Sequence, residues 1–427
     1  MVLSRDRVMF WCALALVLAL GACGDDSDNG ADVGDGNNEV NNDTNNNDAN
    51  NDANNDGNND TNNDDNNDDN NDANNDNSDE LPPMPWSPLE EGFYGIGYSV
   101  DSTTYTSPAD GSERTLRLVY WYPTLDKEGE DAVYGGLLPR PGVFEDASVA
   151  IDEAAPVLIF SHGNSSFAEQ SAFMTEFFAS HGWIVVSMDH TGNTFRDGLE
   201  IGIFQQRPED ISAVIDHIEG LGAEHPLGGL ISDNKILSGH SLGGYTTLAA
   251  SGSGYDLEAI NGACEAGLLD NFFCDYFTQE EIQAVYTNGF ADERIKAAIP
   301  QAPFGGGIFG PGLADIDIPV LLITALLDVT LPPAQDGDPI WNNLDGADDI
   351  RVDFQTGGHF TFSNGCDLGI GDGDGCGDEF IEPEQAFFLV NAYSMIFARY
   401  HLFGDEEHLD ILTGETELDS TLLISTK

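Results

Sequence analysis

One serine lies on a glycine-flanked turn between a strand pattern and a helix pattern. The turn reads Gly239-His240-Ser241-Leu242-Gly243-Gly244, and it connects the apolar run Lys235–Ser238 to the helical stretch Leu242–Ala250. A nucleophile on such a turn adopts strained backbone angles, and glycines two positions before and after it let neighbouring chain segments come close. The turn also points the positive end of the next helix dipole at the site. The pattern indicates that Ser241 is a nucleophile; the alternative is a plain glycine-rich turn.

The order of the strands along the chain indicates which histidine acts as the base. A serine hydroxyl is a weak nucleophile until a base accepts its proton, and a third group orients that base. Of the 9 histidines, only His359 follows the last strand predicted in the core, in Gly357-Gly358-His359-Phe360. We therefore predict that His359 is the base. His162 and His240, which flank other turns, are interpreted as structural.

The acid that orients the base is expected after the preceding strand. The apolar run Pro319–Thr324 leads to Asp328, and position alone selects this residue among 76 acidic side chains. Each of the three predicted catalytic residues then follows a different strand. Three rival acids lie in a loop closer to the predicted base in sequence and are interpreted as surface charge: Asp345, Asp348 and Asp349.

An oxyanion that forms on a substrate carbonyl needs two backbone N–H donors. One donor is expected from Leu242, which directly follows the nucleophile. The other is expected from Asn164, in the loop that follows the apolar run Pro156–Ser161. The alternative for this loop is a simple turn at the end of a strand.

The elements that would position these residues alternate between strands and helices after Ala155. Two β-rich runs precede the alternation, Gly92–Thr104 and Arg114–Tyr122, with a hairpin signal between them. Pro208 is predicted to open a helix whose apolar residues recur with helical spacing. Alternation of this kind predicts an α/β fold, with a mostly parallel central sheet and helices on both faces.

Two insertions, residues 253–292 and 361–383, interrupt the alternation on the side of the sheet where ligands bind in such folds. They are candidate walls of a substrate pocket, and the first is a small insertion after the nucleophile helix. Zinc binding is disfavoured because the cysteines lack the spacing of a zinc knuckle. Each insertion holds one close pair of cysteines, which predicts two disulfides: Cys264–Cys274 and Cys366–Cys376.

The N-terminus has the pattern of an export signal for a lipoprotein. Two arginines precede the apolar stretch Val8–Leu20, which is too short to span a bilayer comfortably. The stretch ends in Leu20-Gly21-Ala22-Cys23, which resembles a bacterial lipobox. Cys23 is therefore expected to carry a membrane anchor after removal of residues 1–22, and Gly24 implies an outer-membrane or surface location. The alternatives are an ordinary secretory signal and a short membrane anchor.

The segment after the lipobox is dominated by Asn and Asp and has no apolar periodicity. Residues 23–80 are thus predicted to be a disordered tether, which leaves residues 81–427 as one catalytic domain. The formal net charge of -62 excludes nucleic acid as a partner. Residues 52–57 match the start of a calcium loop but lack its terminal Glu. Residues 371–378 are interpreted as a flexible acidic loop closed by a disulfide, with calcium binding as the alternative.

Several motifs, taken in order, resemble bacterial relatives of platelet-activating-factor acetylhydrolase, which are often labelled predicted dienelactone hydrolases. The resemblance covers most of residues 93–405. A further stretch, Ala297–Pro303, resembles polyester hydrolases and cutinases, a neighbouring branch. The motifs are Ser161-His162-Gly163, Ala179-Ser180-His181-Gly182-Trp183, Asp189-His190-Thr191-Gly192-Asn193-Thr194, Arg207-Pro208-Glu209-Asp210-Ile211, the Ser241 turn, and Gly358-His359-Phe360-Thr361-Phe362.

This resemblance implies an α/β-hydrolase fold and a serine esterase that needs neither a metal nor a cofactor. It supports Ser241, Asp328 and His359 as the triad, and it implies that the cysteine pairs are family disulfides. True dienelactone hydrolases use a cysteine nucleophile, so the label says little about the substrate. The expected function is cleavage of small-molecule or lipid carboxylic esters through an acyl-enzyme. The alternatives are polyester or amide hydrolysis on the same triad, and non-catalytic binding by a surface lipoprotein.

Overall fold

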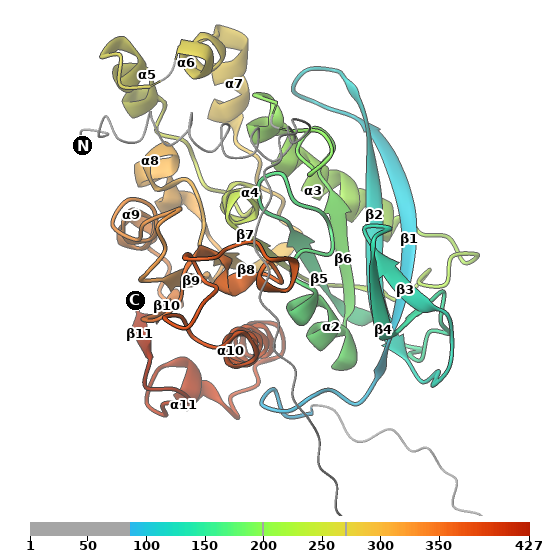
Figure 1. Cartoon of the computed structure of the whole chain (residues 1–427). Coiled ribbons are helices and arrows are strands. Elements are labelled where there is room, and N and C mark those ends of the chain that lie inside the picture. The colour runs from blue at the N-terminus through green and yellow to red at the C-terminus, as the bar shows by residue number, and fades with distance from the viewer. Residues whose placement is uncertain (1–85, 199, 270) are drawn as a thin grey trace, which may run out of the picture. The chain divides into compact units, whose positions relative to one another are not determined.

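The computed structural model describes residues 86–427, except residues 199 and 270 (Figure 1). The predicted signal peptide, the predicted lipidation site Cys23 and the predicted tether lie outside the described residues. Within the described part of the chain, no helix has both the length and the hydropathy that crossing a bilayer requires.

The described residues form one 11-stranded sheet, in the order β11-β10-β9-β8-β7-β5-β6-β2-β1-β4-β3 (Figure 1). The strands from β5 to β10 run parallel to one another, whereas β2 is antiparallel to β1 and β6, and β11 is antiparallel to β10. The expected mostly parallel sheet is confirmed, but β3, β4 and β11 were not predicted from the sequence. The strands are β1 Gly95–Thr106, β2 Glu113–Thr124, β3 Asp131–Tyr134, β4 Leu138–Glu145, β5 Ala155–Ser161, β6 Ile184–Asp189, β7 Ile231–His240, β8 Ile295–Gln301, β9 Leu321–Ala325, β10 Ile350–Phe354 and β11 Leu422–Thr426.

Helices cover both faces of the sheet because its central strands are apolar on both sides. Successive side chains of a strand point to opposite faces, and alternate residues of β5 accordingly enter two different cores. One core includes residues of α2 (Ala172–Ser180) and α10 (Pro383–Phe403), and the other includes residues of α3 (Ile203–Glu219). A third core joins α4 (Leu242–Ala250) to β8 and β9.

Helix α3 begins five residues before the predicted start, at Ile203, so the expectation that Pro208 opens this helix is wrong. A proline inside a helix cannot donate to the carbonyl four residues before it. Here that carbonyl belongs to Phe204, and it accepts a hydrogen bond of 2.8 Å from the hydroxyl of Tyr245 on α4. The tertiary contact replaces the missing helical hydrogen bond, which allows the helix to continue through the proline.

The two insertions fold as short helices and loops, and both predicted disulfides are present. Cys264–Cys274 joins α5 to α6, and Cys366–Cys376 closes the loop after His359. The second loop differs from the expected flexible acidic loop, because Asp374 is only 6% exposed. The remaining α-helices are α5 Leu257–Glu265, α6 Asn271–Phe277, α7 Glu280–Asn288, α8 Gly306–Phe309, α9 Gly337–Asn343 and α11 Leu409–Leu412.

Candidate active site

The structure brings Ser241, His359 and Asp328 into one hydrogen-bonded chain. The Nε2 atom of His359 lies 2.9 Å from Oγ of Ser241, and Nδ1 lies 2.8 Å from Oδ2 of Asp328. A carboxylate only accepts hydrogen bonds, so the ring proton sits on Nδ1 and Nε2 is free to accept the serine proton. His359 and Asp328 are buried, whereas Ser241 is partly exposed, so a substrate can reach the serine but not the hydrogen-bonded histidine and aspartate behind it.

Ser241 lies at the junction of β7 and α4 in a backbone conformation that few side chains adopt. Its φ is 60° and its ψ is -117°, which is a strained region for a residue with a Cβ atom. Its N–H donates to the carbonyl of Gln301 at the end of β8, 2.9 Å away, and this contact holds the turn in place. The strain therefore persists because neighbouring strand ends fix the backbone on both sides.

Gly243 lets the first turn of α4 pack directly against the end of β5. A Cβ atom at this position would overlap the carbonyl oxygen of Ser161, which is backbone and cannot rotate away. We expect Gly243→Ala to lower the free energy of unfolding by roughly 3 kcal/mol, a typical cost of overpacking a rigid core. Urea unfolding followed by circular dichroism measures this change.

A matched control comes from Gly262 in α5, where an added Cβ would meet nothing within 4 Å. Gly262→Ala is expected to raise the unfolding free energy by up to about 1 kcal/mol, because alanine is the better helix former. If the two substitutions changed stability equally, close packing of α4 on β5 would not be what requires glycine at position 243.

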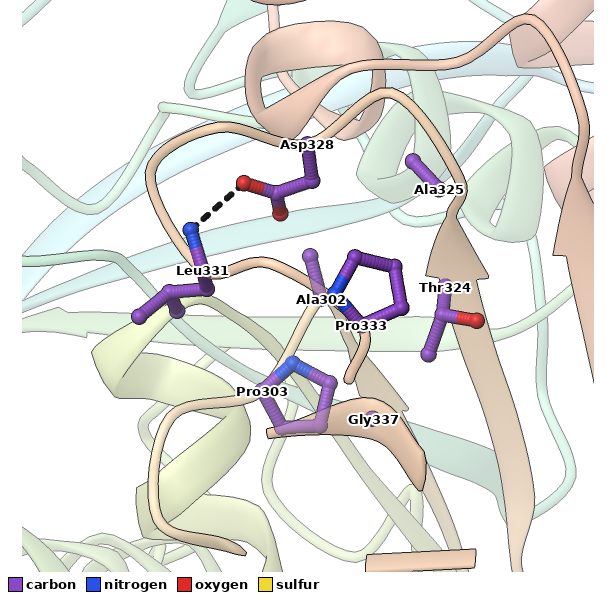
Figure 2. A pocket seen from close by; sticks show the side chains of 8 residues that line it. All are labelled: Ala302, Pro303, Thr324, Ala325, Asp328, Leu331, Pro333 and Gly337. Carbon is purple, nitrogen blue, oxygen red and sulfur yellow. Dashed lines mark hydrogen bonds between the residues drawn. The ribbon is translucent and has the colours of Figure 1, made fainter. Parts of the chain in front are cut away.

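Asp328 occupies the turn after β9 and is held by a second hydrogen bond. Its Oδ1 atom accepts from the N–H of Leu331, 2.6 Å away, so each carboxylate oxygen has a donor (Figure 2). Figure 2 shows that Asp328 also borders a small recess, whose walls include Pro303 and Pro333. Because Ser241 is not among the residues that line this recess, the recess is not the place where a scissile ester would bind.

The three rival acids differ from one another. Asp345 and Asp348 are exposed, as expected for surface charge. Asp349 is buried, and so the interpretation of Asp349 as surface charge is wrong: its carboxylate accepts hydrogen bonds from the N–H groups of Val320 and Gly346. Burial raises the pKa of Asp349 to about 6. These bonds fix the loop before β10 and do not reach His359.

The surroundings of His359 favour its protonated form. Burial by itself lowers the pKa of this imidazole, but the negative charge and the hydrogen bond of Asp328 outweigh burial, and the charges of Asp374 and Asp336 act in the same direction. The net result is a pKa above the ordinary histidine value. An imidazole of this kind is a stronger base toward a serine hydroxyl, because the acids stabilise the cation that forms.

The two predicted oxyanion donors lie on adjacent parallel strand ends. Leu242 is the first residue of α4, where an N–H group has no partner within the helix. Asn164 follows β5, which pairs with β7 so that Ser161 is opposite Gly239. The N–H of the preceding residue, Gly163, is already bound to Oε1 of Gln170 at 2.6 Å. Donation from Leu242 and Asn164 to an oxyanion stays a prediction.

A buried arginine, whose role was not predicted from the sequence, fixes the loop that carries Asn164. Arg207 on α3 donates to Oδ1 of Asn193 at 2.7 Å, and Nδ2 of Asn193 donates to the side chain of Asn164 at 2.9 Å. Arg207 also donates to the carbonyl of His162 and, at 3.0 Å, to the hydroxyl of Thr246 on α4. Burial lowers the pKa of Arg207 to about 9, so it remains a cation at neutral pH. The Arg207-Pro208-Glu209-Asp210-Ile211 motif was the signal that could have identified it.

A second serine–histidine–aspartate chain lies nearby but is inaccessible. Ser161 Oγ is 2.9 Å from Nε2 of His190, whose Nδ1 is 2.8 Å from Asp210, and all three side chains are fully buried. Asp210 also pairs with Arg114 at 2.9 Å. Burial holds the pKa of His190 well below its usual range. No substrate can reach Ser161, so this cluster supports the loop beside the site.

His240 links the base to the loop after β5, which agrees with its interpretation as structural. Its Nε2 donates to the carbonyl of His359 at 2.8 Å, because a carbonyl only accepts, and its Nδ1 accepts from Gln170 at 2.8 Å. Burial keeps the pKa of His240 well below its usual range, so the ring is neutral. Gln170 in turn accepts from Gly163, and one chain of hydrogen bonds therefore joins the base loop to the Asn164 loop.

Apolar side chains are exposed in the loop of Asp328 and beside the loop of Asn164. Leu326, Leu327 and Val329 lie in the loop that carries Asp328, and Val329 is 63% exposed. Phe195 is exposed in the loop beside Asn164, where its N–H donates to the carbonyl of Ser166. For residues 86–427 as described, no group of three or more His, Cys, Asp or Glu side chains has the arrangement of a metal site.

Comparison with known proteins gives a fold but no family. No family model matches the chain, and no curated protein matches it. Among solved structures, the chain is similar to a ferulic acid esterase from Streptomyces cinnamoneus, with a TM-score of 0.53 and 21% sequence identity. The match covers 78% of this chain and 97% of that chain. Likeness at this identity establishes the fold alone, and the expected α/β-hydrolase fold is thereby confirmed.

Proposed function

We propose that this protein is a serine hydrolase that cleaves carboxylic esters through an acyl-enzyme. The observation that carries the proposal is the hydrogen-bonded chain from Ser241 through His359 to Asp328, with the serine partly exposed at a strained strand-to-helix turn. A base that accepts its proton and an acid that orients this base activate a serine hydroxyl as a nucleophile. The sequence resemblance to bacterial platelet-activating-factor acetylhydrolase relatives supports the same chemistry.

In the proposed reaction, Ser241 Oγ attacks the ester carbonyl while Nε2 of His359 takes its proton. Asp328 holds the imidazole in the required tautomer and stabilises its cation. The N–H groups of Leu242 and Asn164 donate to the negatively charged carbonyl oxygen. His359 then gives its proton to the departing alcohol, and afterwards activates the water that hydrolyses the acyl-enzyme.

The substrate that fits best is an uncharged ester with apolar groups on both sides of the carbonyl. Exposed apolar side chains lie in the loop of the acid, where Val329 is one, and beside the Asn164 loop, where Phe195 is one. The net charge of -62 repels anions at long range. Esters of aromatic carboxylic acids belong to this class, and the structurally similar ferulic acid esterase makes them a sensible first choice.

We also propose that the protein is exported and held at the membrane by a lipid on Cys23. The two disulfides support export, because such bonds persist in oxidising compartments. Metabolic labelling with a radioactive fatty acid, in the full chain and in Cys23→Ser, tests the anchor. Equal labelling of both proteins would contradict it.

The pH dependence of ester hydrolysis follows from the raised pKa of His359. The base must be neutral to accept the serine proton, so kcat/KM is expected to rise with pH along a limb centred above the ordinary histidine value of 6.5. Initial rates with p-nitrophenyl esters of increasing chain length, quenched at one alkaline pH, measure both the limb and the size of the acyl site. No turnover of any ester, or a limb centred well below 6.5, would contradict the proposal.

A further inference from the structure

One buried carboxylate connects the loop of the acid to the loop of the base. Asp374 lies between the two cysteines of the Cys366–Cys376 disulfide, and its Oδ1 accepts from the N–H groups of His359 at 2.9 Å and Val329 at 3.1 Å. Its Oδ2 accepts from the N–H of Thr330 at 3.0 Å and from the Thr330 hydroxyl at 2.6 Å. The two segments that bear Asp328 and His359 are therefore joined by a single side chain.

Backbone contacts strengthen the same junction. The carbonyl of Asp374 accepts a hydrogen bond of 2.8 Å from the N–H of Phe360. Gly358 and Gly375 approach so closely that a Cβ atom on Gly358 would overlap the backbone nitrogen of Gly375. The disulfide loop thus packs directly beneath the backbone of the base.

The hydrogen bonds to Asp374 also exclude the calcium interpretation of this loop at that residue. Each carboxylate oxygen already accepts two hydrogen bonds, and the N–H and O–H groups point their positive ends into the space that a cation would need. The carboxylate is satisfied by the protein itself, as a buried charge must be.

We propose that Asp374 is a positioning residue that holds His359 and Asp328 in register, and that the Cys366–Cys376 disulfide keeps Asp374 in place and so makes the activity sensitive to reductants. This rests on the proposed esterase function. Asp374 acts through the backbone of the triad segments, and its carboxylate makes no hydrogen bond to the imidazole itself. Loss of these bonds would misplace the base, and misplacement by about 1 Å can cost about 100-fold in rate.

The disulfide matters because the loop that it closes is rich in glycine. Gly369, Gly371, Gly373, Gly375 and Gly377 all have positive φ. Such a glycine-rich segment has high conformational entropy when it is released. A crosslink that closes the loop reduces that entropy, and the partly exposed Cys376 is accessible to a reductant.

The test of Asp374 uses substitutions that remove one charge each. Asp374→Asn retains the shape but replaces one accepting oxygen by an NH2 donor, and we expect kcat to fall about 10- to 100-fold with little change in KM. Asp372→Asn removes the same charge from the same loop at an exposed side chain, and it should retain kcat within about twofold. Equal rates for wild type and Asp374→Asn would overturn the proposal while leaving the esterase function standing.

A pH titration separates positioning from a general loss of stability. His359 faces the carboxylates of Asp328, Asp374 and Asp336 and the neutral ring of His240. Removal of one of these negative charges should move the midpoint of the His359 titration, followed by NMR, to lower pH in Asp374→Asn but not in Asp372→Asn. This measurement needs no turnover. If the wild type were inactive, the esterase function would be contradicted, but the titration would still test the role of Asp374. An unchanged His359 midpoint would overturn the role of Asp374.

The disulfide is tested by a reductant acting on the full-length protein. Incubation with a phosphine reductant should lower kcat of the wild type by about the factor found for Asp374→Asn, within the 10- to 100-fold range expected for a displaced base. Cys366→Ser/Cys376→Ser should start at the lower value and be insensitive to reductant. Cys264→Ser/Cys274→Ser retains the second disulfide and should still respond. A wild type whose kcat does not change after complete reduction of Cys366–Cys376 would contradict this part of the proposal.

Discussion

Replacing Ser241 by alanine is expected to lower kcat for ester hydrolysis by at least about 10⁴-fold, because no acyl-enzyme can form without the hydroxyl. The same substitution should abolish covalent labelling by a fluorophosphonate, which reports an activated serine directly. The rate with p-nitrophenyl esters and the mass of the labelled protein together measure the effect.

The fold should tolerate this change. The Oγ atom of Ser241 is hydrogen-bonded to His359 and is partly exposed, and alanine meets the same positive φ as serine. Ser251→Ala, at the other end of α4, is the matched control, because its buried Oγ has no hydrogen-bond partner in the structure. It should retain activity. Residual hydrolysis in Ser241→Ala equal to that of wild type would assign the turnover to another residue.

Replacing Asp328 by asparagine is expected to lower kcat about 10⁴-fold through the tautomer of the base. An asparagine has one accepting oxygen, whereas Asp328 accepts from both Leu331 and His359. If the oxygen keeps the Leu331 N–H, the amide NH2 group faces Nδ1 and forces it to accept. The ring proton then moves to Nε2, which can no longer take a proton from Ser241.

The same substitution removes the main charge that raises the pKa of His359. Any residual activity of Asp328→Asn should therefore show its ascending pH limb at lower pH than the wild type. Asp345→Asn is the control, because Asp345 is an exposed rival acid. A larger loss of kcat in Asp345→Asn than in Asp328→Asn would reverse the proposed assignment of the acid.

Much of the fold could be predicted from the sequence because its signals are local. The apolar runs of β5, β7 and β9 and the helical spacing of α3 were recognisable, and both disulfides followed from the close spacing of the cysteines. Strands β3, β4 and β11 lie toward the sheet edges and were not recognised. Strand β3 has only 4 residues, and β4 and β11 alternate exposed and buried residues weakly. The early start of α3 was also missed, because a hydroxyl on α4 replaces the hydrogen bond that Pro208 removes.

In the candidate site, too, the residues with a local or sequential signal were predicted, whereas those that depend on distant contacts were not. Ser241 was identified from six consecutive residues, and His359 and Asp328 from the order of the strands. The sequence alone could not distinguish buried Asp349 from its exposed neighbours, because that difference depends on N–H groups of other segments.

The sequence by itself predicted the turn of the proposed nucleophile, the order of the proposed triad and the α/β alternation, since each depends on residues close together in the chain or on the sequence of elements. Only the tertiary structure revealed the hydrogen-bond partners of Arg207, His240 and Asp374. Their hydrogen bonds join segments that are far apart in the sequence: Arg207 on α3 reaches Thr246 on α4, and Asp374 reaches Thr330 in the loop after β9. A side chain of Asp or Arg is solvated by default, and it becomes a structural support only when folding buries it among donors or acceptors from distant parts of the chain.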